Sequence, residues 1–179
     1  MATKGVLVSI NTSDGGVPKL PVPECRVGVN GLAGDRQRDR HFHGGPNRAV
    51  CLYSLEIIQS LQAEGHPIDI GSAGENLTVS GVDWSAMTPG RRLRVGPVLL
   101  ELTHYAHPCS NLVAYFRDGA FKRISQKVHP GSGRVYARVL EEGVVRAGDP
   151  VEILETVTDG TAEGIYEFRI RFGTDNSQG

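Results

Sequence analysis

The sequence predicts a mostly β fold, and two observations indicate it. Among the 179 residues, 23 glycines and 10 prolines separate short runs rich in Val, Leu and Ile, a pattern typical of short strands joined by tight turns. Residues 88–95 and 146–153 also resemble each other, because each segment passes from a glycine turn into an alternating strand. A corner used twice in this way suits a β-barrel, although two copies do not make a repeat architecture.

Eight strands are expected from these apolar runs. The glycine and proline at 96–97 form a turn between two of them, and the other runs are bounded by glycine, proline or polar residues. In chain order the expected strands are 5–10, 26–29, 49–53, 76–79, 92–95, 98–103, 134–140 and 151–154.

One helix is expected directly after the strand at 49–53. Ser54 can cap its start, Leu55, Ile58 and Leu61 recur on one face, and Gly65 can end it. A second helical stretch is expected at 111–126, with a break in its middle where an aspartate precedes a glycine.

The length predicts one domain, which we place at residues 1–155. A domain of this size buries roughly two-thirds of its unfolded surface, enough for a full core without disulfides. Residues 156–179 turn to Thr, Gly, Asp and Ser and are expected to be an appended extension. Within it, 165–172 is a candidate for one extra strand, and the last residues are expected to be disordered.

Composition narrows the classes of partner. Nineteen basic and twenty acidic residues give a net charge of −1, without the basic excess typical of nucleic-acid binding. No run approaches the roughly 18 to 20 apolar residues of a membrane span, and the start is too polar for a signal peptide. We therefore expect a small-molecule substrate or a protein partner, with no nucleic acid and no membrane.

The cysteines indicate the compartment. There are three, Cys25, Cys51 and Cys109, an odd number with wide spacing that fits free thiols better than a disulfide framework. Free thiols indicate a reducing compartment, so we expect a cytoplasmic protein. Cys51 lies in an apolar strand and is interpreted as a small core residue.

Cys109 is the first candidate for chemistry. It follows the apolar run 98–103, and Pro108 interrupts regular structure there, at a strand end where site residues often lie. Ser110 can cap the helical stretch after it, which places the thiol near a helix N-terminus. Two other dense polar segments precede it, one at 34–48 and one at 74–78, and we expect one site to gather all three.

In their residues and their order, these segments resemble the MOSC domain, the molybdenum-cofactor sulfurase C-terminal domain family. The resemblance runs from about residue 5 to residue 154, and its motifs occur in the family's order. They are Gly31-Leu32-Ala33-Gly34-Asp35, His43-Gly44-Gly45-Pro46, Gly74-Glu75-Asn76-Leu77, Pro108-Cys109, Arg134 to Val139, and Gly148-Asp149.

The resemblance implies a closed β-barrel with a few peripheral helices and a molybdenum cofactor, the metal complex of molybdopterin. It implies that Cys109 binds the molybdenum or handles its sulfur, and that the chain reduces N-hydroxylated or N-oxide substrates. No motif for a nucleotide or an iron–sulfur cluster occurs, so electrons are expected from a partner, a flavin or iron–sulfur reductase. No pyridoxal phosphate is expected in this chain, because the upstream domain of sulfurase members is not part of it.

Cationic and polar loop groups suit an anionic cofactor. Arg48 follows two glycines and can grip phosphate oxygens through two parallel hydrogen bonds, or it is a solvated loop charge. His43 can donate to an oxygen ligand or move a proton, or it bonds its own turn. Arg134 and Arg138 are a second candidate anion site.

A loop-to-strand edge at 75–78 supplies further candidates. Glu75, Asn76 and Thr78 are polar residues that alternate with apolar ones, and Asn76 and Thr78 share a face of the expected strand. They either line the pocket, which we favour, or only stabilise the loop.

Two other functions use the same residues. A non-catalytic carrier would hold the cofactor, or persulfide sulfur on Cys109, and pass it to a cofactor-accepting enzyme. A zinc hydrolase would draw ligands from His41, His43, His104, His107 and Cys109, whose spacing matches no zinc signature.

Overall fold

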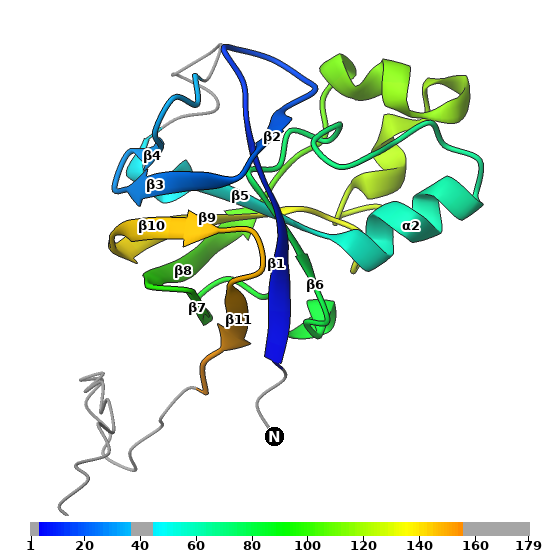
Figure 1. Cartoon of the computed structure of the whole chain (residues 1–179). Helices are drawn as coiled ribbons and strands as arrows, with labels where there is room; N and C mark the ends of the chain where they lie inside the picture. Colours follow the sequence, from blue (N-terminus) through cyan, green and yellow to red (C-terminus); the bar gives the residue numbers. More distant parts are fainter. Residues whose placement is uncertain (1–3, 37–44, 156–179) are drawn as a thin grey trace, which may run out of the picture.

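A computed structural model describes residues 4–36 and 45–155 of the chain (Figure 1). The predicted extension at 156–179, with its candidate strand at 165–172, lies outside the described residues. Eleven strands are present in the described ranges: β1 Lys4–Thr12, β2 Leu20–Val22, β3 Glu24–Gly28, β4 Gly31–Leu32, β5 Val50–Ser54, β6 Leu77–Ser80, β7 Arg92–Val95, β8 Val98–Tyr105, β9 Val135–Glu141, β10 Gly143–Arg146 and β11 Pro150–Ile153.

Seven of the strands described here close into a barrel, as predicted. Their order is β11-β7-β8-β9-β5-β6-β1, and β1 pairs with β11 to complete the ring. Neighbouring strands are antiparallel except for β5 and β6, which are parallel. Closure leaves the seven barrel strands without a free edge. Strand β2 pairs with the last residues of β1, at 10–12. A small sheet of β10, β3 and β4 lies beside the barrel.

All eight predicted strands occur, with ends shifted by at most two residues from their predicted positions. The three strands that were not predicted are β2, β4 and β10, which contain three, two and four residues. Runs this short carry too little alternation to be recognised, and they become strands only through their partners.

The barrel interior is apolar, because strand residues alternate between its two faces. On β5, Val50 and Leu52 are fully buried in the main hydrophobic cluster, and on β9 Val135 and Ala137 join them. Their neighbours at alternate positions therefore point to the outer face of the same wall.

The predicted helix is α2, Leu55–Ala63, with Ser54 as its N-cap. The Ser54 hydroxyl accepts a hydrogen bond from the backbone N–H of Ile57 at 3.3 Å, and Ile58 and Leu61 are buried. The helix was predicted correctly because capping and apolar spacing are local properties of the chain.

The second predicted helical stretch is correct in place but wrong in type. It consists of three short 3-10 segments, Ser110–Tyr115, Arg117–Gly119 and Phe121–Ile124. The break occurs where predicted, because Asp118 has a φ of 57° and no helix continues through such a residue. Tight 3-10 turns are normally used in short pieces of this kind.

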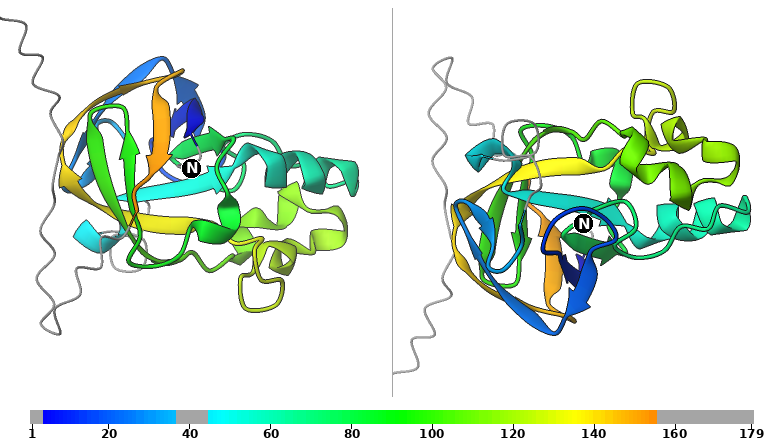
Figure 2. Two further views of the ribbon diagram at one scale, coloured as in Figure 1. Left: turned by 90° about the horizontal axis from the view of Figure 1, so that it is seen from below. Right: turned by 90° about the horizontal axis from the view of Figure 1, so that it is seen from above.

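These helical segments form a lobe beside the barrel, as the two views of Figure 2 show. A second hydrophobic cluster holds the lobe together, and it includes Tyr53 from the outer face of β5. The other buried members are Ile58, Leu61, Ile68, Ala73, Leu112, Phe116 and Ile124. Lobe and barrel therefore meet along the outer face of β5.

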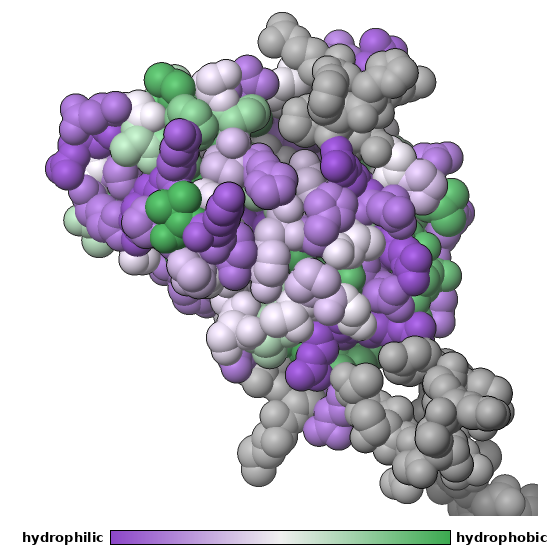
Figure 3. Space-filling model, turned by 180° about the vertical axis from the view of Figure 1, so that it is seen from behind, coloured by the Kyte–Doolittle hydropathy of each residue, from purple (hydrophilic) through white to green (hydrophobic). Residues whose placement is uncertain are grey.

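The face of the molecule seen in Figure 3 is mostly hydrophilic, and its apolar side chains form small patches separated by polar ones. Small separate patches are ordinary for a protein surface. In the described ranges, no helix is both long and apolar enough to cross a membrane.

Candidate functional site

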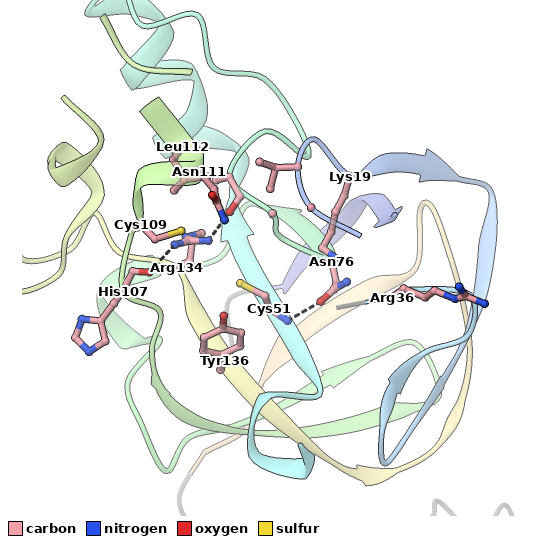
Figure 4. Close-up of a pocket in the computed structure, with 14 residues that line it drawn as sticks. Lys19, Arg36, Cys51, Asn76, His107, Cys109, Asn111, Leu112, Arg134 and Tyr136 are labelled. Atoms are coloured by element: carbon pink, nitrogen blue, oxygen red, sulfur yellow. Dashed lines mark hydrogen bonds between the residues drawn. The ribbon is translucent and has the colours of Figure 1, made fainter. Parts of the chain in front are cut away.

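A cavity of about 110 Å³ lies between the outer face of the barrel wall and the lobe (Figure 4). We call it the Cys109 cavity. It is lined by Gly16, Val17, Lys19, Arg36, Cys51, Ala73, Gly74, Asn76, His107, Cys109, Asn111, Leu112, Arg134 and Tyr136. Parts of all three polar segments singled out in the sequence meet here, at 36, at 73–76 and at 107–109.

Cys109 lies in the cavity wall and is partly exposed. Strand β8 ends at Tyr105, and Cys109 takes the N-cap position of the 3-10 segment that follows. Its carbonyl oxygen accepts a hydrogen bond from the N–H of Leu112 at 3.0 Å, which fixes the turn. In Figure 4 its side chain points toward Arg134. The thiol is therefore accessible from a cavity with both polar and apolar lining residues, and it is not sealed in the core.

Arg134 joins the two loops that flank the cavity. Its guanidinium donates hydrogen bonds to the backbone carbonyls of Ala73 and of His107, the latter at 3.3 Å. The residue is 6% exposed, and its Nε atom is buried without a partner among the described residues. A buried guanidinium bonded only to neutral carbonyls keeps its full positive charge, so it makes the cavity attractive to an anion.

Asp35 organises the opposite side of the cavity. Its carboxylate accepts hydrogen bonds from Lys19 Nζ at 2.7 Å, from the Asn76 side-chain amide at 2.9 Å, and from the backbone N–H of Ser13 at 2.9 Å. The Lys19 and Asp35 side chains are 10% and 4% exposed, so this ion pair is largely shielded from water. The pair places an ammonium group and an amide at the cavity surface.

Two glycines allow these loops to approach each other. Gly71 has a φ of 83°, and a side chain there would collide with the carbonyl oxygen of Lys19. Gly74 has a φ of 79°, and a Cβ there would lie 3.1 Å from Val17. Only glycine adopts such backbone angles without strain, so both positions set the closeness of the N-terminal loop to the 71–76 loop.

Asn76 lines the cavity as expected, whereas Glu75 and Thr78 do not. The Glu75 carboxyl is fully buried behind the wall, where it accepts hydrogen bonds from Gly71 N–H at 2.7 Å and from the Thr78 hydroxyl at 3.1 Å. Burial raises the pKa of Glu75 above its ordinary value, against the lowering effect of these hydrogen bonds and of Arg134. The structure therefore places Glu75 and Thr78 in the loop's support.

Cys51 is buried, as predicted, but it lies outside both hydrophobic clusters and lines the Cys109 cavity. It belongs to the outer face of β5, between the inward-pointing Val50 and Leu52. Burial raises the pKa of its thiol to about 11, so the group is neutral near pH 7. The cavity thus contains a second thiol, in the protonated form.

Arg48 and Arg138 lie on the other side of Tyr136, in a more open depression of about 730 Å³ that we call the Arg48 groove. Arg138 is paired there with Glu101. Arg48 donates a hydrogen bond from Nε to Nε2 of His104 at 3.0 Å and lies over the Tyr136 ring at 5.9 Å. Neither arginine lines the Cys109 cavity, and the groove is otherwise lined by Gly45, Pro46, Asn47, Gly90, Leu102 and Thr103.

The zinc alternative finds no support in the part of the chain that the structure describes, because no group of three or more His, Cys, Asp or Glu residues there is arranged to hold a metal. His104 accepts a hydrogen bond from Arg48, and the His107 ring turns away from the cavity in Figure 4. His41 and His43 lie outside the described residues.

Four cavity residues with polar side chains escaped prediction as site residues: Cys51 and Tyr136, together with Lys19 and Asn111. Lys19 lies in a proline-flanked loop, and Tyr136 and Cys51 lie in strands with apolar neighbours. For Cys51 and Tyr136, the strand alternation could have given the signal, because each lies between two residues that point into the barrel. Arg134 and Arg138 were predicted to form one anion site, but Arg134 lines the Cys109 cavity and Arg138 lines the Arg48 groove, on the other side of Tyr136.

Comparison with known proteins identifies the family. The MOSC domain matches residues 39–152, which is more than half of the chain. YflK of Bacillus subtilis (strain 168), described as an uncharacterized protein, is 33% identical over 122 residues, 68% of this chain and 54% of YflK. Protein YiiM of Escherichia coli (strain K12) is 29% identical over 137 residues, 74% of this chain and 60% of YiiM.

The crystal structure of YiiM from Geobacillus stearothermophilus superimposes with a TM-score of 0.67 at 26% identity, covering 85% of this chain and 76% of that one. The chain belongs to the MOSC domain family, which is associated with binding of the molybdenum cofactor. It spans little more than half of the length of the two sequence relatives, 54% and 60%. The predicted resemblance and the predicted barrel are both confirmed.

Proposed function

We propose that this protein holds a molybdenum cofactor in the Cys109 cavity, with the Cys109 thiolate as a ligand of the metal. We further propose that it reduces N-hydroxylated or N-oxide substrates there. The observation that carries the proposal is a partly exposed thiol in the wall of a cavity that the buried guanidinium of Arg134 also lines.

The chemistry of the lining residues matches that of such a cofactor. A thiolate is a soft ligand of the kind that suits molybdenum, and Arg134, which bonds to neutral backbone carbonyls, supplies positive charge for an anionic pterin phosphate. The side-chain amide of Asn111 offers a donor and an acceptor of the type that pterin rings require. The cofactor supplies oxygen-atom exchange coupled to a two-electron change, which no side chain supplies alone.

The chain's own residues then have distinct tasks. Arg134 attracts the anion, and its buried hydrogen bonds to the backbone carbonyls of Ala73 and His107 keep it in place before anything binds. Preorganised charges of this kind cost no reorganisation when the ligand arrives. The lobe covers one side of the cavity and limits the access of water.

Electrons come from outside this chain in our proposal, from a flavin or iron–sulfur reductase. We also propose a cytoplasmic location, because the described structure contains three free cysteines and such thiols suit a reducing compartment.

Metal analysis tests the proposal. Protein made in a host that synthesises the cofactor should carry molybdenum, and Cys109→Ser should lose most of it. Cys25→Ser is the matched control, because Cys25 bonds to the Ala33 carbonyl at 3.3 Å and lies outside the cavity. Equal molybdenum in wild type and Cys109→Ser, or zinc in its place, would contradict the proposal.

A turnover assay separates reductase from carrier. Molybdenum-loaded protein is supplied with an N-hydroxylated aromatic amine and reduced methyl viologen as the electron donor. Conversion of the N-hydroxylated amine to the amine by wild type, abolished in Cys109→Ser, supports a reductase. Bound molybdenum without turnover, together with transfer of the cofactor to a cofactor-free acceptor enzyme, would replace the reductase by a carrier.

A further inference from the structure

Tyr136 stands between the Cys109 cavity and the Arg48 groove. Strand pairing places it opposite His104 of β8 on one side and opposite Cys51 of β5 on the other. Directly paired residues of antiparallel strands point to the same face of a sheet. His104, Tyr136 and Cys51 therefore form a row across the outer face of the barrel wall.

The ring of Tyr136 is held from the groove side. Its centroid lies 5.2 Å from that of His104, with the rings tilted by 41°, and the Arg48 guanidinium carbon lies 5.9 Å from it. Arg48 also donates to Nε2 of His104 at 3.0 Å. This bond requires a free lone pair on Nε2, so His104 is neutral, and burial followed by the charge of Arg48 lowers its pKa accordingly.

The hydroxyl of Tyr136 points into the Cys109 cavity in Figure 4. It makes no hydrogen bond with any residue of the described ranges. In those ranges, the fully buried side-chain atoms without a hydrogen-bond partner are Glu75 Oε2 and Arg134 Nε. The Tyr136 oxygen is not among them, so it is accessible from the cavity. Burial raises its pKa to about 12, which leaves a protonated phenol near pH 7.

The other polar groups at the cavity differ from this phenol in chemistry. Lys19 and Arg134 are charged and already bonded to Asp35 and to backbone carbonyls. The Asn76 amide accepts a hydrogen bond from Cys51 N–H and donates to the Asn11 carbonyl and the Asp35 carboxylate. The phenol is a neutral donor on a rigid ring beside Cys51, its partner in the β5–β9 pairing, which suits it to the oxygen of a neutral molecule.

We propose that Tyr136 donates a hydrogen bond to the oxygen atom of the substrate in the Cys109 cavity, and that Arg48 and His104 are positioning residues that hold its ring. The inference rests on the proposed function and names the group that recognises the N–O oxygen. Tyr136 is specificity-determining, because an analogue without that oxygen leaves the phenol unpaired.

A binding experiment without the cofactor tests this. Full-length protein from a host that lacks the cofactor is titrated with pyridine N-oxide, and the Kd is measured by calorimetry. Tyr136→Phe, which removes one oxygen atom, should raise the Kd about tenfold, the usual effect of losing one hydrogen bond. Tyr53→Phe is the matched control: its hydroxyl donates to Ser132 at 2.8 Å, away from the cavity, so its Kd should stay unchanged.

Alkylation of Cys109 by iodoacetamide locates the probe, since pyridine N-oxide in the cavity should slow it. Equal Kd values for wild type and Tyr136→Phe, no binding by wild type, or undiminished alkylation would each overturn the inference. Molybdenum in wild type from a competent host reports separately on the proposed function. Wild type with molybdenum but without a Tyr136 effect would refute this inference alone.

Arg48 variants test the positioning role. Arg48→Ala should raise the Kd for pyridine N-oxide less than Tyr136→Phe does, and it should speed the Tyr136 ring flip seen in NMR line shapes. Arg48→Lys keeps a cation near the ring and should restore part of both effects. An Arg48→Ala protein with unchanged ring flip and unchanged Kd would remove Arg48 from the proposal.

Discussion

The two faces of the barrel wall at β5 and β9 differ in chemistry although both are largely buried. The inner face carries Val50, Leu52, Val135 and Ala137, all with no exposed surface. The outer face carries Cys51 and Tyr136, with Arg134 immediately before β9. The inner face therefore provides stability, and the outer face provides a buried but polar surface on which a ligand site is built. One stretch of chain serves both purposes because strand residues alternate.

Adjacent residues of β5 give the largest expected contrast. Leu52→Ala empties space in the barrel core and should lower the free energy of unfolding by about 2 to 5 kcal/mol. Cys51→Ala removes a single sulfur beside an existing cavity and should cost about 1 kcal/mol or less. Urea denaturation of both variants measures the difference. Equal losses would show that the outer face is as much a core as the inner face.

Glu75 sharpens the comparison through pH. Its raised pKa means that the folded protein holds the proton more tightly than the unfolded chain, so stability falls as pH rises above the ordinary value of 4.5. Glu75→Gln cannot ionise, so wild type should lose stability relative to it as the pH rises above 4.5.

Unfolding free energies of wild type and Glu75→Gln at several pH values measure this effect. Glu142→Gln, which removes an exposed carboxylate paired with Arg26, is the control for the loss of one negative charge. Parallel curves for Glu75→Gln would mean that Glu75 is charged in the folded state.

Glu56 gives the smallest effect, because its side chain lies in the first turn of α2 and is exposed to solvent. Burial alone would raise its pKa, but hydrogen bonds from Ser80, Ser54 and Gly81 outweigh it and lower the pKa to about 2. Its stabilisation is therefore present above the ordinary value of 4.5 and is lost as pH falls toward 2.

Glu56→Gln should cost about 0.5 kcal/mol at neutral pH after allowance for solvent screening. The variant and wild type should converge near pH 2, as followed by urea denaturation. Molybdenum content should stay unchanged, because Glu56 does not line the Cys109 cavity. A loss of molybdenum would extend the ligand site beyond the cavity.

Local signals predicted most of the fold. Alternation and turn residues located eight strands, and a serine cap with spaced apolar residues located α2. The helical stretch after Cys109 was placed correctly, but its 3-10 geometry depends on how Leu112, Phe116 and Ile124 pack into the lobe. The short strands β2, β4 and β10 form by pairing with β1 or β3, so no local sequence pattern predicts them.

The sequence by itself determined which segments are polar, where the chain turns, and that Cys109 ends a strand. Only the tertiary structure decided that Lys19 and Asp35 meet Asn76, that Cys51 faces a cavity, and that Tyr136 separates Arg134 from Arg48. The physical reason is register. Alternation shows that a strand has two faces, but the pairing of strands from distant parts of the chain decides which side chains share a face and a cavity.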